Sequence, residues 1–336
     1  MLCELCPREC KVNRKSGIVG YCGETDTVRI ARAALHNWEE PCISGYGDYF
    51  DAAIGSGAIF FTGCNMRCIF CQNHNISGSK VGMEVSITRL AEIMLELEAR
   101  EACNINLVTP SHFIPQIASA IKIARDDGLT LPIVYNTSAY EKVDTIRLLD
   151  GLIDIYLPDF KYMDDTLAMK FSGAREYSTT ATAAIDEMVR QIRKRAGRPI
   201  MMEATSSETI DDMASAEAAD TRADTLCSFD ERGVMTRGVI VRHMIMPGHT
   251  KDSIDVIRHV YERYGEDVYI SIMNQYTPLS HVMESEYEEL KRKVTKREYN
   301  KVVDFATELG IVNGFIQEGK TQSESFIPAF DYTGVL

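Results

Sequence analysis

No uninterrupted apolar stretch in the sequence approaches the roughly 20 residues that a membrane-spanning helix needs. The start of the chain also lacks the apolar segment of a secretory signal, because it reads MLCELCPREC. Basic residues are too few for general nucleic-acid binding: 36 Lys and Arg face 49 Asp and Glu, and the formal net charge is −13. We therefore expect a cytoplasmic protein without a membrane or nucleic-acid partner.

Cysteine is scarce in most of the chain and concentrated at its beginning. Only Cys103 and Cys227 lie beyond residue 71, and the other eight of the ten cysteines precede them. In a reducing compartment, such a set is better explained by metal ligation than by disulfides.

Beyond residue 55, short β-rich runs alternate with helical stretches, without a clear repeat period. Strands are expected at 58–62, 104–110, 131–137, 152–157, 239–246 and 268–273. Apolar strands that alternate with amphipathic helices imply parallel βαβ units. About six such units predict an α/β fold, a partial (β/α)6 barrel with its chemistry at the carboxyl ends of the strands.

The helix boundaries carry signals of their own. Residues 86–100 place apolar side chains on one helical face. Thr250 is expected to cap a helix that stops at Gly265. Thr295 and Glu298 have the spacing of a capping box at the start of a C-terminal helix.

Three regions follow from these patterns. A cysteine-rich, metal-binding extension is expected at 1–50, the barrel at 51–275 and a helical extension at 276–336. Residues 203–226 are acidic and rich in small side chains, which favours a flexible surface insertion within the barrel.

The strongest chemical signal is the cysteine loop, residues 63–71, which follows the first expected barrel strand. Cys64, Cys68 and Cys71 are spaced so that three thiolates can reach three corners of an iron–sulfur cubane. Three thiolates leave the fourth iron open to a small molecule. Spacing alone is also compatible with a zinc knot or with three unrelated core cysteines.

With Phe70 before its third cysteine, this loop resembles the CxxxCxxC loop of radical S-adenosylmethionine enzymes. The run SGAIFFTGCNMRCIFCQNHNIS is similar to the pyruvate formate-lyase activating enzyme group, in its activating-enzyme-like branch. Later segments agree with that branch, namely LVTPSHFIPQI, LPIVYNTSAY, LLDGLIDIYLPDFKYMDD, GVIVRHMIMPGH and ISIMNQYTP. The resemblance covers nearly the whole chain apart from the acidic segment.

The resemblance implies a barrel of the radical S-adenosylmethionine type, with a [4Fe–4S] cluster on the three cysteines. It implies that S-adenosylmethionine chelates the open iron and, on reduction, yields a 5′-deoxyadenosyl radical that abstracts hydrogen from a substrate. The substrate it suggests is a protein or peptide, as in glycyl-radical activation, and the reductant is a low-potential flavodoxin or ferredoxin. Two alternatives remain: the same chemistry on a small molecule, and a non-catalytic iron–sulfur or zinc protein that binds or transfers electrons.

Two strand-end segments match the family's cofactor contacts. Asp159 and Lys161 resemble the family's Asp-x-Lys, and a lysine ammonium suits a carboxylate partner. An ordinary ion pair is the alternative. Asn136 stands where related enzymes carry an aspartate near the nucleoside and a cation site, and a simple Asx turn is the alternative there.

Other candidate positions are less closely matched. Ser111 lies where the family usually has acceptors for the cofactor's amino group, or it caps the following helix. Arg242, costly to bury unless paired, resembles a partner of the cofactor carboxylate, and strand alternation directs His243 to the opposite face. Residues 39–41, Glu-Glu-Pro, resemble a segment of the same branch and are interpreted as a structural contact with the barrel.

Cys3, Cys6, Cys10 and Cys22 form a separate set, with glycines and a proline between them that suit tight turns. Four thiolates can close a zinc site or hold a second iron–sulfur cluster, and a metal-free thiol cluster is the third interpretation. The spacing does not decide among the three.

Overall fold

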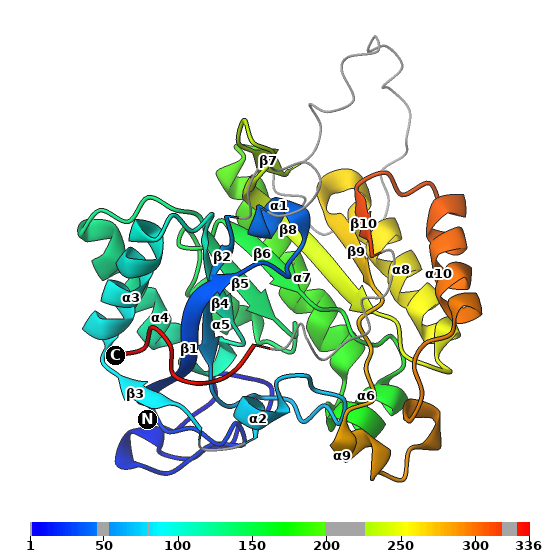
Figure 1. The fold of residues 1–336 in the computed structure, drawn as a ribbon, viewed down its shortest axis with the longest axis horizontal. Helices are drawn as coiled ribbons and strands as arrows, with labels where there is room; N and C mark the ends of the chain where they lie inside the picture. Colours follow the sequence, from blue (N-terminus) through cyan, green and yellow to red (C-terminus); the bar gives the residue numbers. More distant parts are fainter. Residues whose placement is uncertain (1, 46–53, 79–80, 199–225, 318–327) are drawn as a thin grey trace, which may run out of the picture.

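The computed structural model describes residues 2–45, 54–78, 81–198, 226–317 and 328–336 (Figure 1). The acidic segment expected to form a flexible insertion, 203–226, lies outside these ranges except for Leu226. In the described ranges, no helix has both the length and the apolar character that crossing a bilayer requires.

A mostly parallel sheet organises the chain. Its strands are β1 (Val28–His36), β2 (Ser56–Phe61), β3 (Met83–Val85), β4 (Ile105–Val108), β5 (Ile133–Thr137), β6 (Ile155–Pro158), β7 (Ser228–Phe229), β8 (Met235–Met244), β9 (Tyr269–Met273) and β10 (Gly314–Ile316). Their order is β10-β9-β8-β6-β5-β4-β2-β1-β3, with β7 pairing beside β8. All neighbours from β2 to β10 along this path are parallel, whereas β1 pairs antiparallel with both β2 and β3.

The predicted α/β fold is confirmed, and each of the six expected strands is present, as β2, β4, β5, β6, β8 and β9. The sheet also contains β1 and β10, which lie outside the region 51–275. The domain boundaries at residues 50 and 275 stay predictions.

The helices mostly lie between parallel strands, on the outer face of the sheet, whereas the short α1 (Pro41–Ser44) packs against its concave side (Figure 1). The others are α2 (His74–Ser77), α3 (Ile87–Ala99), α4 (Ile114–Asp126), α5 (Val143–Arg147), α6 (Asp165–Ser172), α7 (Tyr177–Arg195), α8 (Thr250–Tyr264), α9 (Ser280–Met283) and α10 (Lys296–Glu308). Short 3-10 turns lie at Arg14–Ser16, Ser111–Phe113, Gly265–Asp267 and Glu288–Leu290.

Of the helix-end signals, two are confirmed and one is wrong. Gly265 is the C-cap of α8, as expected. Thr295 and Glu298 form the full capping box of α10. Thr250, by contrast, does not cap α8: it is the first helical residue, and His249 occupies the cap position without a side-chain hydrogen bond. The chain turns one residue earlier than expected, because the amide of His249 already bonds to the carbonyl of Met246.

Alternation along the strands divides the core into two layers. Outward residues such as Tyr135, Tyr156 and Val241 belong to the large cluster between sheet and helices. Inward residues such as Ile155 and Ile240 line the concave side of the sheet. Both faces of the parallel strands are therefore buried, as such sheets require.

The concave side is filled by residues 39–45, which follow β1 and include α1; we call them the interior segment. Its Cys42 and Ile43 pack against apolar side chains of β5, β6 and β8. Asn104, which directly precedes β4, donates its amide to the Ile43 carbonyl at 2.7 Å and accepts from the Ser56 hydroxyl at 2.6 Å. The interior segment therefore closes one end of the barrel and leaves the other end open.

We expect Asn104→Ala to lower the free energy of unfolding by about 1–3 kcal/mol, because it leaves a buried carbonyl and a buried hydroxyl without their partner. Urea denaturation would measure this. Ser119→Ala, which removes an exposed hydroxyl on α4, is the control and should stay within about 0.5 kcal/mol of wild type. Equal effects of the two substitutions would show that Asn104 does not anchor the interior segment.

Candidate functional site

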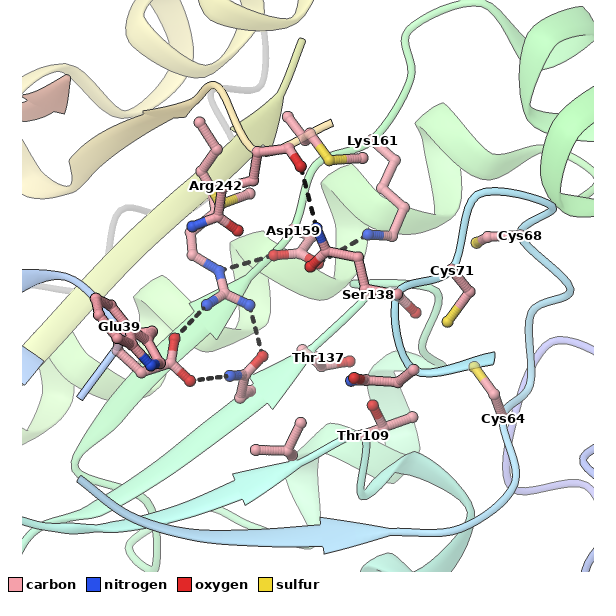
Figure 2. A pocket seen from close by; sticks show the side chains of 18 of the residues that line it. Glu39, Cys64, Cys68, Cys71, Thr109, Thr137, Ser138, Asp159, Lys161 and Arg242 are labelled. Atoms are coloured by element: carbon pink, nitrogen blue, oxygen red, sulfur yellow. Dashed lines mark hydrogen bonds and ion pairs between the residues drawn. The ribbon is translucent and has the colours of Figure 1, made fainter. Parts of the chain in front are cut away.

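A cavity of about 230 Å³ opens at the carboxyl ends of the parallel strands (Figure 2). Its walls come from the ends of β4, β5, β6, β8 and β9, from the cysteine loop and from the interior segment. Side chains at the ends of several parallel strands converge there, which is where barrel enzymes place their chemistry. The cavity brings together Cys64, Cys68, Cys71, Asn136, Asp159, Lys161 and Arg242 of the residues predicted from the sequence.

The backbone holds the cysteine loop in place. Gly63, two residues after the end of β2, adopts a φ of +77°, and a side chain there would collide with Glu24 and with the Cys22 carbonyl. Further along, the amides of Arg67 and Ile69 donate to the carbonyls of the last two residues of α6, at 3.1 and 2.8 Å. The three cysteines are thus fixed by contacts outside the loop itself.

The three thiols lie in one electrostatic environment. Burial raises the pKa of Cys64, Cys68 and Cys71, that of Cys71 to about 11, and the charge of Cys68 raises the pKa of the other two further. Lys161 opposes this rise at Cys68, and the Ser172 hydroxyl donates to the Cys68 sulfur at 3.0 Å. These thiols are therefore close neighbours that a positively charged group would favour as thiolates.

The donor set fits a [4Fe–4S] cluster. Cubane ligands sit on separate iron atoms, so the three sulfurs need not meet around one ion. In the described part of the chain, no group of three or more His, Cys, Asp or Glu side chains surrounds a single metal ion. Three soft sulfur donors that face one cavity match the ligands that such a cluster takes from a protein.

Opposite the cysteines, a chain of alternating charges crosses the cavity wall (Figure 2). Lys161 Nζ lies 2.8 Å from Asp159 Oδ2, and Arg242 Nε lies 2.8 Å from Asp159 Oδ1. Arg242 Nη1 lies 2.9 Å from Glu39 Oε2, and Nη2 donates to Asn136 Oδ1 at 2.6 Å. Although burial opposes ionisation, the two cations hold the pKa of Asp159 below its usual value.

His243 faces away from this wall, as strand alternation predicted. Its Nδ1 lies 2.8 Å from the Phe160 carbonyl, and burial lowers its pKa to about 4. It is a buried, neutral side chain behind the cavity.

Ser111 is not among the cavity-lining residues. It is buried at the start of a 3-10 turn, and its hydroxyl donates to Glu141 Oε1 at 2.5 Å. The same oxygen accepts from Thr137 at 2.5 Å and from Tyr135 at 3.2 Å. The role of Ser111 toward a cofactor stays a prediction, whereas its observed contact joins the segments that follow β4 and β5.

Sequence reasoning gave no cofactor role to Glu39 and Glu40, which line the cavity, or to Glu141, which lies outside its lining. Glu39 lines the cavity, so the predicted contact of residues 39–41 with the barrel is present and also forms part of the wall. The resemblance of the Glu-Glu-Pro run was the available signal for Glu39. Glu141 carries no motif signal, because its importance arises only when two strand ends meet.

The N-terminal cysteines lie behind the cysteine loop. Cys6 and Cys22 are buried, and burial raises the pKa of Cys6 to about 12. The Tyr21 amide donates to the Cys10 sulfur at 3.1 Å. These cysteines, with Cys3, do not enclose a single ion within the described residues. A zinc ion or a second cluster at this set stays a prediction.

The N-terminal region and the cysteine loop are nevertheless in direct contact. The Cys64 amide donates to the Cys22 carbonyl at 3.3 Å, and Arg8 Nε donates to the Asn65 carbonyl at 2.7 Å. The guanidinium of Arg8 also stacks on the Tyr21 ring, 4.0 Å from its centroid. Residues 2–25 therefore support the cysteine loop on the side away from the cavity.

The chain matches no protein-family model. It is similar to an uncharacterized protein of Methanocaldococcus jannaschii, with 25% identity over 313 residues, which cover 90% of this chain and 74% of that protein.

Three solved structures are also similar. SuiB of Streptococcus suis bound to S-adenosylmethionine gives a TM-score of 0.44 at 13% identity, covering 76% of this chain and 48% of that one. HydG, a maturase of the [FeFe]-hydrogenase, gives 0.45 at 12% identity, covering 78% and 50%. TYW1 with a lysine-pyruvate adduct bound gives 0.44 at 13% identity, covering 87% of each chain. The chain spans about half the length of SuiB and HydG.

Glu141 should make stability depend on pH. Burial raises its pKa to about 7 from an ordinary value of 4.5, against the hydrogen bonds that favour the carboxylate. The folded state therefore keeps a proton that the unfolded state releases, and wild type loses stability as pH rises from about 4.5 to about 7. Glu141→Gln cannot ionise, so we expect its stability relative to wild type to rise across this window, by at most about 3 kcal/mol.

Urea unfolding at pH 5, 6, 7 and 8 would measure the difference. Ser119→Ala, which adds no titrating group, should differ from wild type by the same amount at every pH. A difference between Glu141→Gln and wild type that is also constant would mean that Glu141 ionises alike in both states.

Proposed function

We propose that the cavity holds a [4Fe–4S] cluster on Cys64, Cys68 and Cys71 together with S-adenosylmethionine, and that the protein is a radical S-adenosylmethionine enzyme. The observation that carries this proposal is the position of the cysteine trio. Three thiols of one loop face the same cavity as the paired charges of Asp159, Lys161 and Arg242. A cluster with only three protein ligands has an iron left for a substrate or cofactor, which an electron carrier does not need.

When bound, the reduced cluster supplies the one electron that splits the sulfonium into methionine and a 5′-deoxyadenosyl radical, which abstracts hydrogen. The electron comes from a low-potential reductant of the flavodoxin or ferredoxin type. The chain itself supplies binding, orientation and exclusion of water. The strand-end position of the cavity and its mixed polar and apolar walls suit those tasks.

Lys161 has the charge and placement to receive the carboxylate of S-adenosylmethionine. One of its three N–H donors goes to Asp159, which orients the ammonium without using all its capacity. Three of the five N–H donors of Arg242 go to Asp159, Glu39 and Asn136. Arg242 is thus held mainly by the protein, and Lys161 is the better candidate for direct contact with the cofactor.

The proposed substrate is a protein or peptide, as in the activation of a glycyl-radical enzyme. This part of the proposal is supported by the resemblance of residues 56–77 and the later segments to the activating-enzyme-like branch.

The cluster assignment predicts the behaviour of Cys68→Ala. Anaerobically reconstituted wild-type protein, given S-adenosylmethionine and a strong reductant, should form 5′-deoxyadenosine. Cys68→Ala should form none and should lose the iron–sulfur absorbance of the site. Cys103→Ala is the matched control, since Cys103 is buried and free of disulfides but lies outside the cavity. Product formation by Cys68→Ala at the wild-type rate would refute the assignment.

The role of Lys161 predicts a loss of affinity. Lys161→Met keeps an unbranched side chain as far as Cε but removes the ammonium, so the Kd for S-adenosylmethionine should rise about tenfold or more. Lys170→Met, which removes a lysine paired with Glu289 at the surface, should leave the Kd unchanged. Isothermal titration of both reconstituted variants gives the comparison. If the two variants bind equally well, Lys161 does not contact the cofactor.

A further inference from the structure

Glu39 is fully engaged by partners from three strands. Its Oε2 accepts from Arg242 of β8 at 2.9 Å, and its Oε1 accepts from Asn136 of β5 at 3.2 Å and from Asn106 of β4 at 3.0 Å. Its side chain is only 10% exposed. A carboxylate so enclosed, and brought in by the interior segment rather than by a strand, fixes the groups around it.

The orientation of the Arg242 guanidinium depends on this carboxylate. Arginine and carboxylate groups favour two parallel hydrogen bonds, and the donor that lies beside Nε is Nη2. Asp159 nevertheless receives only Nε, because Nη2 donates to Asn136 while Nη1 is held by Glu39. The second oxygen of Asp159 is thereby left for Lys161. Without Glu39, the guanidinium would turn toward Asp159 and compete with Lys161 for that oxygen.

Lys161 is in turn the link to the cysteine loop. Its charge acts on Cys68, and it lines the cavity between Asp159 and the cysteines (Figure 2). The contacts therefore run in sequence from Glu39 through Arg242 and Asp159 to Lys161.

We infer that Glu39 is a positioning residue for S-adenosylmethionine, acting through Arg242 to keep Lys161 in place for the cofactor carboxylate. This inference rests on the proposed function and deepens it. It gives the interior segment a role in cofactor binding although it contributes no cluster ligand.

A glutamine at position 39 tests the hydrogen-bonding role of the carboxylate separately from its volume. In Glu39→Gln, one carboxylate oxygen becomes an NH2 group of the same size. That group must face either the Arg242 guanidinium or the two asparagine amides, all of which are donors. Neither orientation satisfies the network, so the substitution releases Arg242 with little change in volume.

A double-mutant cycle tests the inference. The Kd for S-adenosylmethionine would be measured by isothermal titration on reconstituted Glu39→Gln, Arg242→Gln and the double variant. We expect each single variant to weaken binding about tenfold, and the double variant also about tenfold, because both changes disturb one pathway. The rate at saturating S-adenosylmethionine should stay within about twofold of wild type, which separates lost positioning from lost catalysis.

Two further variants serve as a control and as an independent test of the inference. Glu96→Gln removes a glutamate from an exposed pair with Arg89 on α3 and should bind as wild type does. Asn106 lies outside the cavity lining, and Asn106→Ala removes one hydrogen bond to Glu39. We expect it to raise the Kd about threefold. This variant keeps the test informative if Glu39→Gln folds poorly.

Three results would overturn the inference. Wild-type affinity in both Glu39→Gln and Asn106→Ala would show that Glu39 does not position the cofactor site. A double variant weakened about a hundredfold would show that Glu39 and Arg242 act independently. If no protein binds S-adenosylmethionine, wild type included, the proposed function itself is rejected. That result differs from a failure of the inference about Glu39, in which wild type still binds.

Discussion

The buried guanidinium of Arg242 is the group on which the architecture of the cavity depends. A charge in the barrel interior is tolerated only when its partners compensate for lost hydration. Glu39, Asp159 and Asn136 do so from the interior segment and from two neighbouring strand ends. Satisfying one charge thus brings three separate parts of the chain to defined positions. The remaining oxygen of Asp159 then fixes Lys161, and the wall facing the cysteines is complete.

Local sequence patterns correctly predicted the strands that alternate with helices. The six expected strands are buried, apolar runs between helices, so their pattern is independent of distant residues. The strands β1, β3, β7 and β10 were not predicted, because β1 continues a cysteine-rich region and the others are only two or three residues long. The contrast between Thr295, which caps its helix, and Thr250, which does not, shows how a preceding turn decides the cap position.

In the site, too, local patterns identify some residues, whereas others are identified only by contacts with distant parts of the chain. Cys64, Cys68 and Cys71 are adjacent in sequence, and Asp159 and Lys161 end a strand, so motif and position identify them. Glu39 and Glu141 become informative only when other strands approach them. The sequence left Ser111 with two interpretations, a contact with the cofactor's amino group or a helix cap, and only the fold shows that its hydroxyl donates to Glu141. Long-range partners of this kind cannot be read from local patterns.

The contact between Glu39 and Arg242 joins residues 203 positions apart. Closing so long a loop is slow compared with forming local helices and adjacent strands, so we expect this contact to form late in folding. During synthesis, the cysteine loop leaves the ribosome well before β8 exists to complete the wall opposite it. The thiols of the nascent chain would consequently be exposed to oxidants and to unspecific metal ions, although they are shielded in the folded barrel. An anaerobic or strongly reducing cell would limit that exposure.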